Sequence, residues 1–370
     1  MKIAILTFHR AYNCGAMLQA WALKTVLERM GHKVEFPICN HVGESGRWAV
    51  GWRKWPRNFL GFSHSLLRCL VYNLASIPGE DILRRRFKNF RKHELPERVC
   101  SIEDLSNLYD AIIVGSDQVW SSTHTGNDAA LFFGENLPKN VKKIAYSVSY
   151  GDKCISDERL RRVALATNNF DYVSARESLV SNQLKCVISK NIPVTLDPTL
   201  LLTKNDYRHF KWKNPKSSYL FMYTLDTNSF FVESARRIAK QLKVKAIIAP
   251  MYQKSRFGAP SGLTYGISPD LLISYVANAD YVVSHSFHGT VLPILFNKPF
   301  LSLRLEKEDM NKPSRVGTLL ELTGSMDRLI TPDVSIGEMI TKLVAPMNID
   351  EARLGMSRRA SLNWLQNVLK

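Results

Sequence analysis

Acidic residues are scarce in this sequence relative to basic ones. The chain holds 50 Lys and Arg but only 33 Asp and Glu, which gives a formal net charge of +17. A chain with this balance attracts anions such as nucleic acids, anionic lipid surfaces or phosphorylated substrates. The shortage of acids is greatest between Arg47 and Lys92, where eleven basic residues stand with only Glu80 and Asp81.

Long hydrophobic runs and paired cysteines are also missing. No window of eighteen residues is uninterruptedly apolar, which excludes an ordinary transmembrane helix. The segment MKIAILTFHR lacks the cleavage site of a signal peptide, and we expect it to form the first strand. The six cysteines form no CxxC pair, which argues against a zinc site and a disulfide framework and favours reduced thiols in a cytoplasm. They are Cys14, Cys39, Cys69, Cys100, Cys154 and Cys186.

Patterns of nucleic-acid-binding domains are absent as well. The chain contains no helix-turn-helix pattern, no zinc pattern and no RNP-like aromatic strand, so nucleic-acid binding remains a remote alternative that net charge alone supports. The content of 45% apolar and 22% charged residues is instead that of an ordinary soluble globular protein. A length of 370 residues suffices for two domains, each with its own core.

The first half of the chain alternates strand and helix patterns. KIAILTF predicts a strand, Met17–Met30 has apolar residues at helical spacing and ends before Gly31, and HKVEFPI predicts a second strand. This opening indicates a parallel, doubly wound sheet. Further strands are expected at AIIVG, KKIAYSVS and DYVSAR, and VTLDPTLLL ends the first domain, which we place at residues 1–205.

The same alternation begins again near Tyr219. YLFMYTL, KAIIAP, DYVVS and KPFLSL predict strands, with helices between them, in a second domain at residues 215–345. Residues 346–370 predict a terminal helix that folds back over the first domain. The expected fold is α/β, with two domains and a cleft between them, and ligands in such folds bind at the carboxyl ends of the strands.

A basic helical insertion interrupts the first domain at about residues 44–95. It carries Trp48, Trp52 and Trp55 and the apolar stretch FLGFSHSLLRCLVYNLASI. Basic residues mixed with tryptophan are typical of a membrane-surface patch. The alternative is a solvated insertion that packs on its own domain, because charged runs are usually solvated faces.

One polar loop lies between a predicted strand and the helix that follows it, in YVVSHSFHGTVLP (residues 281–293). A helix N-terminus holds anions well, and Gly289 allows close approach of a ligand to the backbone. Ser286 and Thr290 can donate hydrogen bonds to phosphate or carboxylate oxygens. His288 can transfer a proton near neutral pH, although a histidine after a strand is often only a structural hydrogen-bonding residue.

Three further loops follow predicted strands. Asn13 and Gly15 precede a helix, Ser116 and Asp117 follow the strand AIIVG, and Arg176 ends the strand DYVSAR. Each loop also has a structural interpretation, with Asn13 and Asp117 as helix caps and Arg176 as the partner of a nearby carboxylate. All four loops are nevertheless expected at the ligand-binding edge of the two domains.

These segments, in this order, resemble the polysaccharide pyruvyltransferase family. The resembling stretches are NCGAMLQAWAL, YDAIIVGSDQVW, SARES, LDPTLLL and ADYVVSHSFHGTVLPILFNKPF, and the resemblance runs from residue 3 to about 325. It implies two Rossmann-like domains in a GT-B-like arrangement. It also implies phosphoenolpyruvate as the donor substrate, with no cofactor and no metal, and a saccharide as the acceptor.

The chain departs from the family pattern at one position. Many members carry an arginine two residues before the motif histidine, where this chain has Ser286. Arg176 matches the family's SxR arginine, and Arg304 and Arg315 are the other candidates for the missing cation. The departure also leaves open a different donor.

The implied reaction assigns roles to these residues. Making a pyruvate ketal requires an acid near C3 of the enolpyruvyl group, a base near a sugar hydroxyl, and cations for phosphate and carboxylate. We expect His288 to be the acid and Asp117 the base. The donor would contact Arg176, Ser286, Gly289, Thr290, Arg304 and Arg315, and the acceptor would contact Asn13, Gly15 and Ser116.

Two further expectations depend on the same resemblance. The acceptor sugar is expected on a lipid diphosphate carrier, which places the protein in the cytoplasm with peripheral contact to the inner face of an anionic membrane. The alternative function is that of a GT-B glycosyltransferase that uses a nucleotide sugar, because it shares the fold and a helix N-terminus also binds diphosphates. The oligomeric state is left open.

Overall fold

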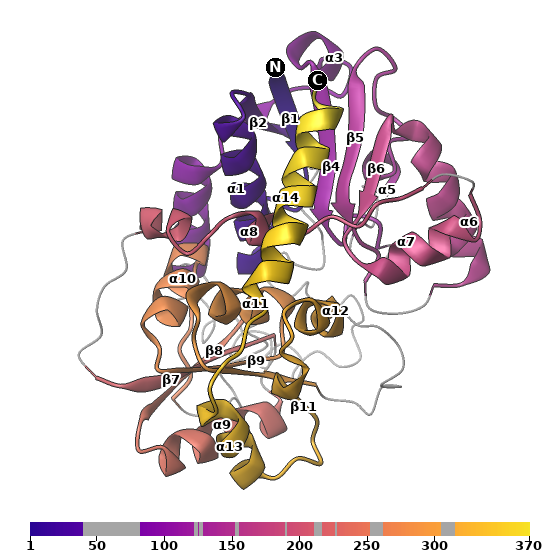
Figure 1. The fold of residues 1–370 in the computed structure, drawn as a ribbon. Helices are drawn as coiled ribbons and strands as arrows, with labels where there is room; N and C mark the ends of the chain where they lie inside the picture. The colour runs from indigo at the N-terminus through magenta and orange to yellow at the C-terminus, as the bar shows by residue number, and fades with distance from the viewer. Residues whose placement is uncertain are drawn as a thin grey trace, which may run out of the picture.

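Two parallel sheets form the framework of the protein (Figure 1). The computed structural model describes residues 1–39, 82–121, 125, 129–151, 155–188, 191–210, 217–225, 228–251, 262–304 and 315–370. The first sheet has six strands in the order β3-β2-β1-β4-β5-β6. Their bounds are β1 Lys2–Leu6, β2 Lys33–Ile38, β3 Glu97–Val99, β4 Ala111–Asp117, β5 Lys142–Val148 and β6 Tyr172–Ala175.

The second sheet has five strands in the order β11-β10-β9-β7-β8, and every strand pair in it is also parallel. The two sheets belong to the two α/β domains that the sequence predicts, and the predicted strands occur within a few residues of their expected positions. The bounds are β7 Tyr219–Thr224, β8 Lys245–Pro250, β9 Tyr281–Ser284, β10 Phe300–Leu303 and β11 Leu329–Ile330.

Helices connect the strands, as a parallel sheet requires. The first domain contains α1 Cys14–Arg29, α3 Leu105–Leu108, α5 Ala129–Phe132, α6 Asp157–Ala166, α7 Ser178–Lys185 and α8 Pro198–Leu201, with a further helix over residues 82–94. The second contains α9 Ser229–Gln241, α10 Pro269–Asn278, α11 Phe287–Phe296, α12 Arg315–Leu322 and α13 Ile336–Val344.

Each sheet has a point at which the direction of winding reverses. In the first sheet it lies between β1 and β4, and in the second it lies between β7 and β9. A crevice forms at such a point because the connections on its two sides leave in opposite directions, and it is the usual ligand site of doubly wound folds. The loops that follow these four strands therefore form the expected ligand site.

The last helix, α14 (Glu351–Val368), returns to the first domain. Figure 1 shows it running along that domain toward the end at which the N-terminus lies. Arg358 donates a hydrogen bond to the carbonyl of Leu200, and the hydroxyl of Ser361 accepts one from the Leu196 amide. A single hydrophobic core accordingly includes side chains of the first domain, the second domain and α14.

The basic insertion is described only in part. Residues 40–81, with the three tryptophans, lie outside the described residues. In the helix over residues 82–94, Leu83, Phe87 and Phe90 are buried in the core, whereas Arg85 and Lys88 are exposed. This helix therefore packs on the protein by an apolar face and presents a basic face outward. In the described part of the chain, no helix is both long and apolar enough to cross a membrane.

Candidate active site

A cavity of about 380 Å³ lies between the two domains, where both points of reversed winding face each other. It is lined by residues at or after the ends of β1 and β4 in the first domain and of β7, β8 and β9 in the second, together with residues at the start of α12. Those of chemical interest are Asn13, Gly15, Asp117, His285, His288 and Arg315.

The start of α11 is built from hydroxyl groups. The Oγ of Ser286 accepts a hydrogen bond of 2.9 Å from the Gly289 amide, which caps the helix. A side chain at Gly289 would collide with Ser284, because a Cβ atom there would lie 2.1 Å from its Oγ. Thr290 is buried and donates to the Ser286 carbonyl. These contacts set the direction in which the next side chain, His288, leaves the helix.

The ring of His288 is held between the two domains and is only 9% exposed. Its Nε2 lies 3.5 Å from Oδ2 of Asp197, which is an ion-pair distance longer than an ordinary hydrogen bond. Its Nδ1 lies against Gly15, where an added Cβ would come within 2.1 Å of that nitrogen. Only glycine at position 15 leaves room for the imidazole in this place.

Asp197 is fully buried and caps α8. The Thr199 hydroxyl donates to its Oδ1 at 2.6 Å, and Nη1 of Arg176 donates to its Oδ2 at 3.1 Å. Burial by itself would raise the pKa of this carboxyl, but the adjacent His288 and Arg176 and the Thr199 hydroxyl hold the pKa well below its usual value. Asp197 is therefore a buried anion at neutral pH, and it joins the motif histidine to the motif arginine.

Arg176 is buried behind the residues that line the cavity, and carboxylates surround it. Besides Asp197, its guanidinium contacts Glu177 at 2.8 Å and Asp117 at 3.5 Å, and it stacks 4.9 Å from the ring centre of Phe287. Burial acts to lower the pKa of this arginine, and the carboxylates of Glu177, Asp117 and Asp197 outweigh it and raise the pKa. Among the described residues, its Nη2 has no hydrogen-bond partner.

The loops that follow β1 and β4 are also ordered by hydrogen bonds. The Oδ1 of Asn13 accepts hydrogen bonds from the amides of Gly15 and Ala16 at 2.9 and 3.2 Å, which starts α1. Asp117 lines the cavity and accepts a hydrogen bond from the Gln118 amide. Ser116 is buried and donates to the Ser147 carbonyl.

The predicted site residues thus fall into three groups by position. Those that line the cavity are Asn13, Gly15, Asp117, Ser286, His288 and Arg315. Arg176, Gly289 and Thr290 lie behind it in contact with these residues, and Ser116 directly precedes Asp117 in the chain. Arg304 follows β10, where its amide donates to the Ile330 carbonyl, and it is not part of the cavity lining. The functional roles assigned to these residues stay predictions.

Two residues of the site were not predicted. Asp197 stands in LDPTLLL, which is one of the stretches that resemble the family, and it directly precedes the proline of a helix start, but no role was assigned to it. His285 was not among the predicted site residues; it lines the cavity, stacks on Phe231 at 4.2 Å and contacts the Thr224 hydroxyl.

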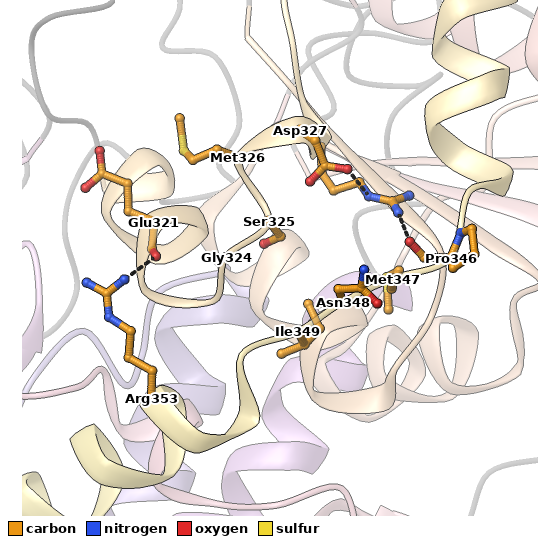
Figure 2. Close-up of a pocket in the computed structure, with 11 residues that line it drawn as sticks. Glu321, Gly324, Ser325, Met326, Asp327, Pro346, Met347, Asn348, Ile349 and Arg353 are labelled. Atoms are coloured by element: carbon orange, nitrogen blue, oxygen red, sulfur yellow. Dashed lines mark hydrogen bonds and ion pairs between the residues drawn. The ribbon is translucent and has the colours of Figure 1, made fainter.

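A larger hollow of about 670 Å³ lies in the second domain, away from this cavity (Figure 2). Both arginines that line this hollow donate hydrogen bonds to backbone carbonyl groups. Arg353 donates to the Glu321 carbonyl, and Arg328 donates to those of Ala345 and Pro346. None of the residues that line this hollow follows the strands at which the winding of either sheet reverses. We therefore place the candidate active site in the interdomain cavity. Over the described residues, no group of three or more His, Cys, Asp or Glu side chains could hold a metal ion.

The fold is of the GT-B type, with a cavity between its two α/β domains. Two UDP-GlcNAc 2-epimerases are similar in structure. The one from Methanocaldococcus jannaschii, in complex with UDP-GlcNAc and UDP, has a TM-score of 0.53 and 12% identity over 99% of this chain and 100% of that chain. The one from Neisseria meningitidis, bound to UDP-GlcNAc, has a TM-score of 0.50 and 11% identity over 100% of this chain and 99% of that chain.

The family follows from the sequence rather than from the fold. The family model described as polysaccharide pyruvyl transferase matches residues 13–306, which is most of the chain. The protein belongs to this family of transferases. A search of the curated proteins found no match to the chain.

Proposed function

We propose that the protein transfers pyruvate, as a ketal, from phosphoenolpyruvate to a saccharide. The observation that supports this most directly is the position of His288. It stands at the start of α11 in the interdomain cavity, backed by Asp197 and across from Asp117 and Asn13. An acid on one wall of a cavity and a carboxylate on the other is what addition of a hydroxyl to an enol ether requires.

His288 is the proposed general acid. Because its Nε2 faces the carboxylate of Asp197, Nδ1 is the nitrogen on the side of Gly15, which itself lines the cavity. We assign proton transfer to Nδ1. Asp197 is then a positioning residue that keeps the ring in this orientation, in the way a buried carboxylate orients a catalytic histidine in hydrolases.

The proposed reaction has four steps that balance in atoms and charge. His288 delivers a proton to C3 of the enolpyruvyl group, and C2 gains oxocarbenium character. A sugar hydroxyl adds to C2 while Asp117 accepts its proton. The C2–O bond to phosphate then breaks, and the leaving phosphate takes up the proton held by Asp117. A second hydroxyl of the same sugar adds at C2 and closes the cyclic ketal. Asp117 accepts its proton, which restores the acid form of His288 through solvent.

The donor carries a phosphate and a carboxylate, and the second domain offers two features for them. The N-terminus of α11 favours an anion through its partial positive charge. Arg315, at the start of α12, brings a guanidinium to the cavity wall. Arg176 lies deeper and already contacts three carboxylates, so we propose Arg315 as the main substitute for the arginine missing at Ser286.

The acceptor is proposed to be a sugar of a cell-surface polysaccharide or of its lipid-diphosphate-linked precursor. Support comes from the family and from the exposed basic residues of the helix over residues 82–94. A basic face of this kind would hold the enzyme at an anionic membrane, where a lipid-linked acceptor is found.

The deciding experiment combines the purified protein with phosphoenolpyruvate and a panel of glycans. Release of inorganic phosphate that depends on one glycan, together with a new methyl signal of the ketal in the proton NMR spectrum, would establish the activity. Phosphoenolpyruvate left intact with every glycan class, while a nucleotide sugar is consumed, would overturn it.

That second outcome is the alternative function, a glycosyltransferase that uses a nucleotide sugar. The GT-B fold is compatible with it, since the fold alone does not choose between donors. Isothermal titration with phosphoenolpyruvate and with UDP-sugars distinguishes the two proposals before any acceptor is known.

A further inference from the structure

Two cysteines that follow neighbouring strands lie side by side in the first domain. β2 and β3 are parallel, and Ile38 stands opposite Val99, so that the next residues along are Cys39 and Cys100. Their sulfur atoms are 3.7 Å apart, and both are free thiols. We infer that Cys39 and Cys100 form a site of reversible oxidation, at which an intramolecular disulfide forms by exchange with a small-molecule disulfide.

The backbone geometry suits this bond. Neighbouring strands are about 4.8 Å apart, and the Cα atoms of a disulfide are usually about 4.4–6.8 Å apart. The two sulfurs, now 3.7 Å apart, have to reach a bond length of about 2.05 Å. Rotation of the side chains can supply that approach, so that the sheet does not have to rearrange.

The two thiols differ in access, which sets the order of events. Cys39 is fully buried, whereas Cys100 is partly exposed. The Cys100 thiolate attacks one sulfur of the small disulfide, whose S–S bond breaks and releases one thiol. Cys39 then attacks the sulfur of Cys100 in this mixed disulfide, and the second small thiol leaves. The protein pair is oxidised by two electrons, the small disulfide is reduced, and the two thiol protons end on the released thiols.

The surroundings of the pair make the exchange slow at neutral pH. Burial raises the pKa of Cys39 to about 12, and the neighbouring Cys100 and the carboxylates of Glu103 and Asp104 act in the same direction. Burial also raises the pKa of Cys100, as do Asp104 and Glu35, while Arg98 acts to lower it. Because the thiolate is the attacking species, the rate rises as the pH is increased toward these values.

The test uses the whole protein and oxidised glutathione at pH 8.5, followed by alkylation of the remaining thiols and peptide mapping. We expect a peptide pair linked through Cys39 and Cys100, and a fall in titratable thiols from six to four. The disulfide closes a loop between residues 61 apart, so Tm should rise by about 3 °C and return to its first value with dithiothreitol.

A matched pair of variants tests the assignment. Cys100→Ser should abolish the intramolecular link and the rise in Tm. Cys186→Ser, at an exposed cysteine elsewhere in the first domain, should leave both unchanged. Glutathione attached to Cys100 without closure, or a link from Cys39 or Cys100 to any other cysteine, would overturn the inference.

Discussion

The carboxylate of Asp197 and the imidazole of His288 meet across the domain boundary, with 3.5 Å between Oδ2 and Nε2. One residue caps a helix of the first domain, and the other lies in the first turn of a helix of the second. The orientation of the proposed acid therefore depends on how the two domains sit against each other. A catalytic group placed in this way is in position only when the cavity is assembled.

Replacing His288 should remove most activity and leave the fold intact. Loss of a general acid costs about a hundredfold to ten-thousandfold in rate. The readout is kcat for phosphate release, with circular dichroism and Tm as checks on folding. His285→Ala is the comparison, and we expect a smaller loss because His285 stacks on Phe231, whereas His288 lies beside the carboxylate of Asp197. A folded His288→Ala protein with near wild-type turnover would make His288 a structural residue.

Asp197→Asn should lower both kcat and stability. The change keeps the size of the side chain but removes the charge between Arg176 and His288, and breaking a buried ion pair costs about 3 kcal/mol. A positioning role predicts a lower kcat with little change in the donor KM. An unchanged kcat in a folded variant would show that the carboxylate only caps α8 and does not orient His288.

The same variant tests the pH dependence of stability. Because the pKa of Asp197 is lower in the folded state than its ordinary value of 3.8, the carboxylate stabilises the protein fully above that value. The stabilisation is lost as the pH falls through the lower folded-state pKa. Wild-type Tm should therefore approach that of Asp197→Asn as the pH is lowered from 7 to 2.5. Parallel Tm curves over that range would contradict the assignment.

Gly15→Ala should damage the site through His288. An added Cβ would lie 2.1 Å from Nδ1 of the imidazole, so that the ring has to turn away from the cavity or the domains have to separate. We expect a loss of at least about tenfold in kcat. Gly355→Ala in α14 is the control, because the nearest atom to its Cβ is 3.7 Å away and activity should be unaffected. Equal activity of the two variants would mean that the ring has free space.

Two arginine variants distinguish a residue that binds the donor from one that stabilises the fold around the site. Arg315→Gln should raise the donor KM by about tenfold or more, because it removes a guanidinium from the cavity wall. Arg176→Lys should mainly lower Tm, since a lysine cannot reproduce the contacts with Glu177 and Asp197. A raised donor KM for Arg176→Lys, with Arg315→Gln unchanged, would reverse this assignment.

The exposed basic face of the helix over residues 82–94 should bind anionic vesicles. Co-sedimentation should weaken with salt, because each basic residue near such a surface contributes only about 1 kcal/mol and is screened. Changing Arg85, Lys88 and Lys92 to Gln should reduce it without affecting turnover on a soluble acceptor. Arg86 is kept, since it donates to the Gly266 carbonyl and supports the packing. Equally poor binding to anionic and neutral vesicles would leave the helix a solvated insertion.

The sequence predicted most strands because they are buried and apolar. β4 and β7 are buried at every position, and such runs are easily recognised. β3 was missed because all three of its residues, Glu97–Val99, are exposed at a sheet edge, and β11 has only two residues. Neither leaves a periodic pattern from which a strand can be predicted.

The site was predicted in part for a related reason. The polar loops could be placed at strand ends one at a time, so His288, Asp117 and Gly15 were predicted. The contacts between them depend on the packing of the two domains. The role of Asp197 could not be predicted because its partners, Arg176 and His288, are distant in sequence. A local role as the cap of a helix is enough to explain an aspartate at this position.

The return of α14 gives the chain two crossings between the domains instead of one. The first leads from α8 to β7, and the second leads from α13 to α14. Two crossings act as a pair of hinge points, so that the domains can rotate about the line that joins them while other rotations strain one connection or the other. Arg328 donates hydrogen bonds to the carbonyls of Ala345 and Pro346 at the start of the second crossing. The hinge of this crossing is therefore expected after residue 346. If the cavity opens in this way, we expect rotation about one axis, which would bring His288 back to Asp197 on closing.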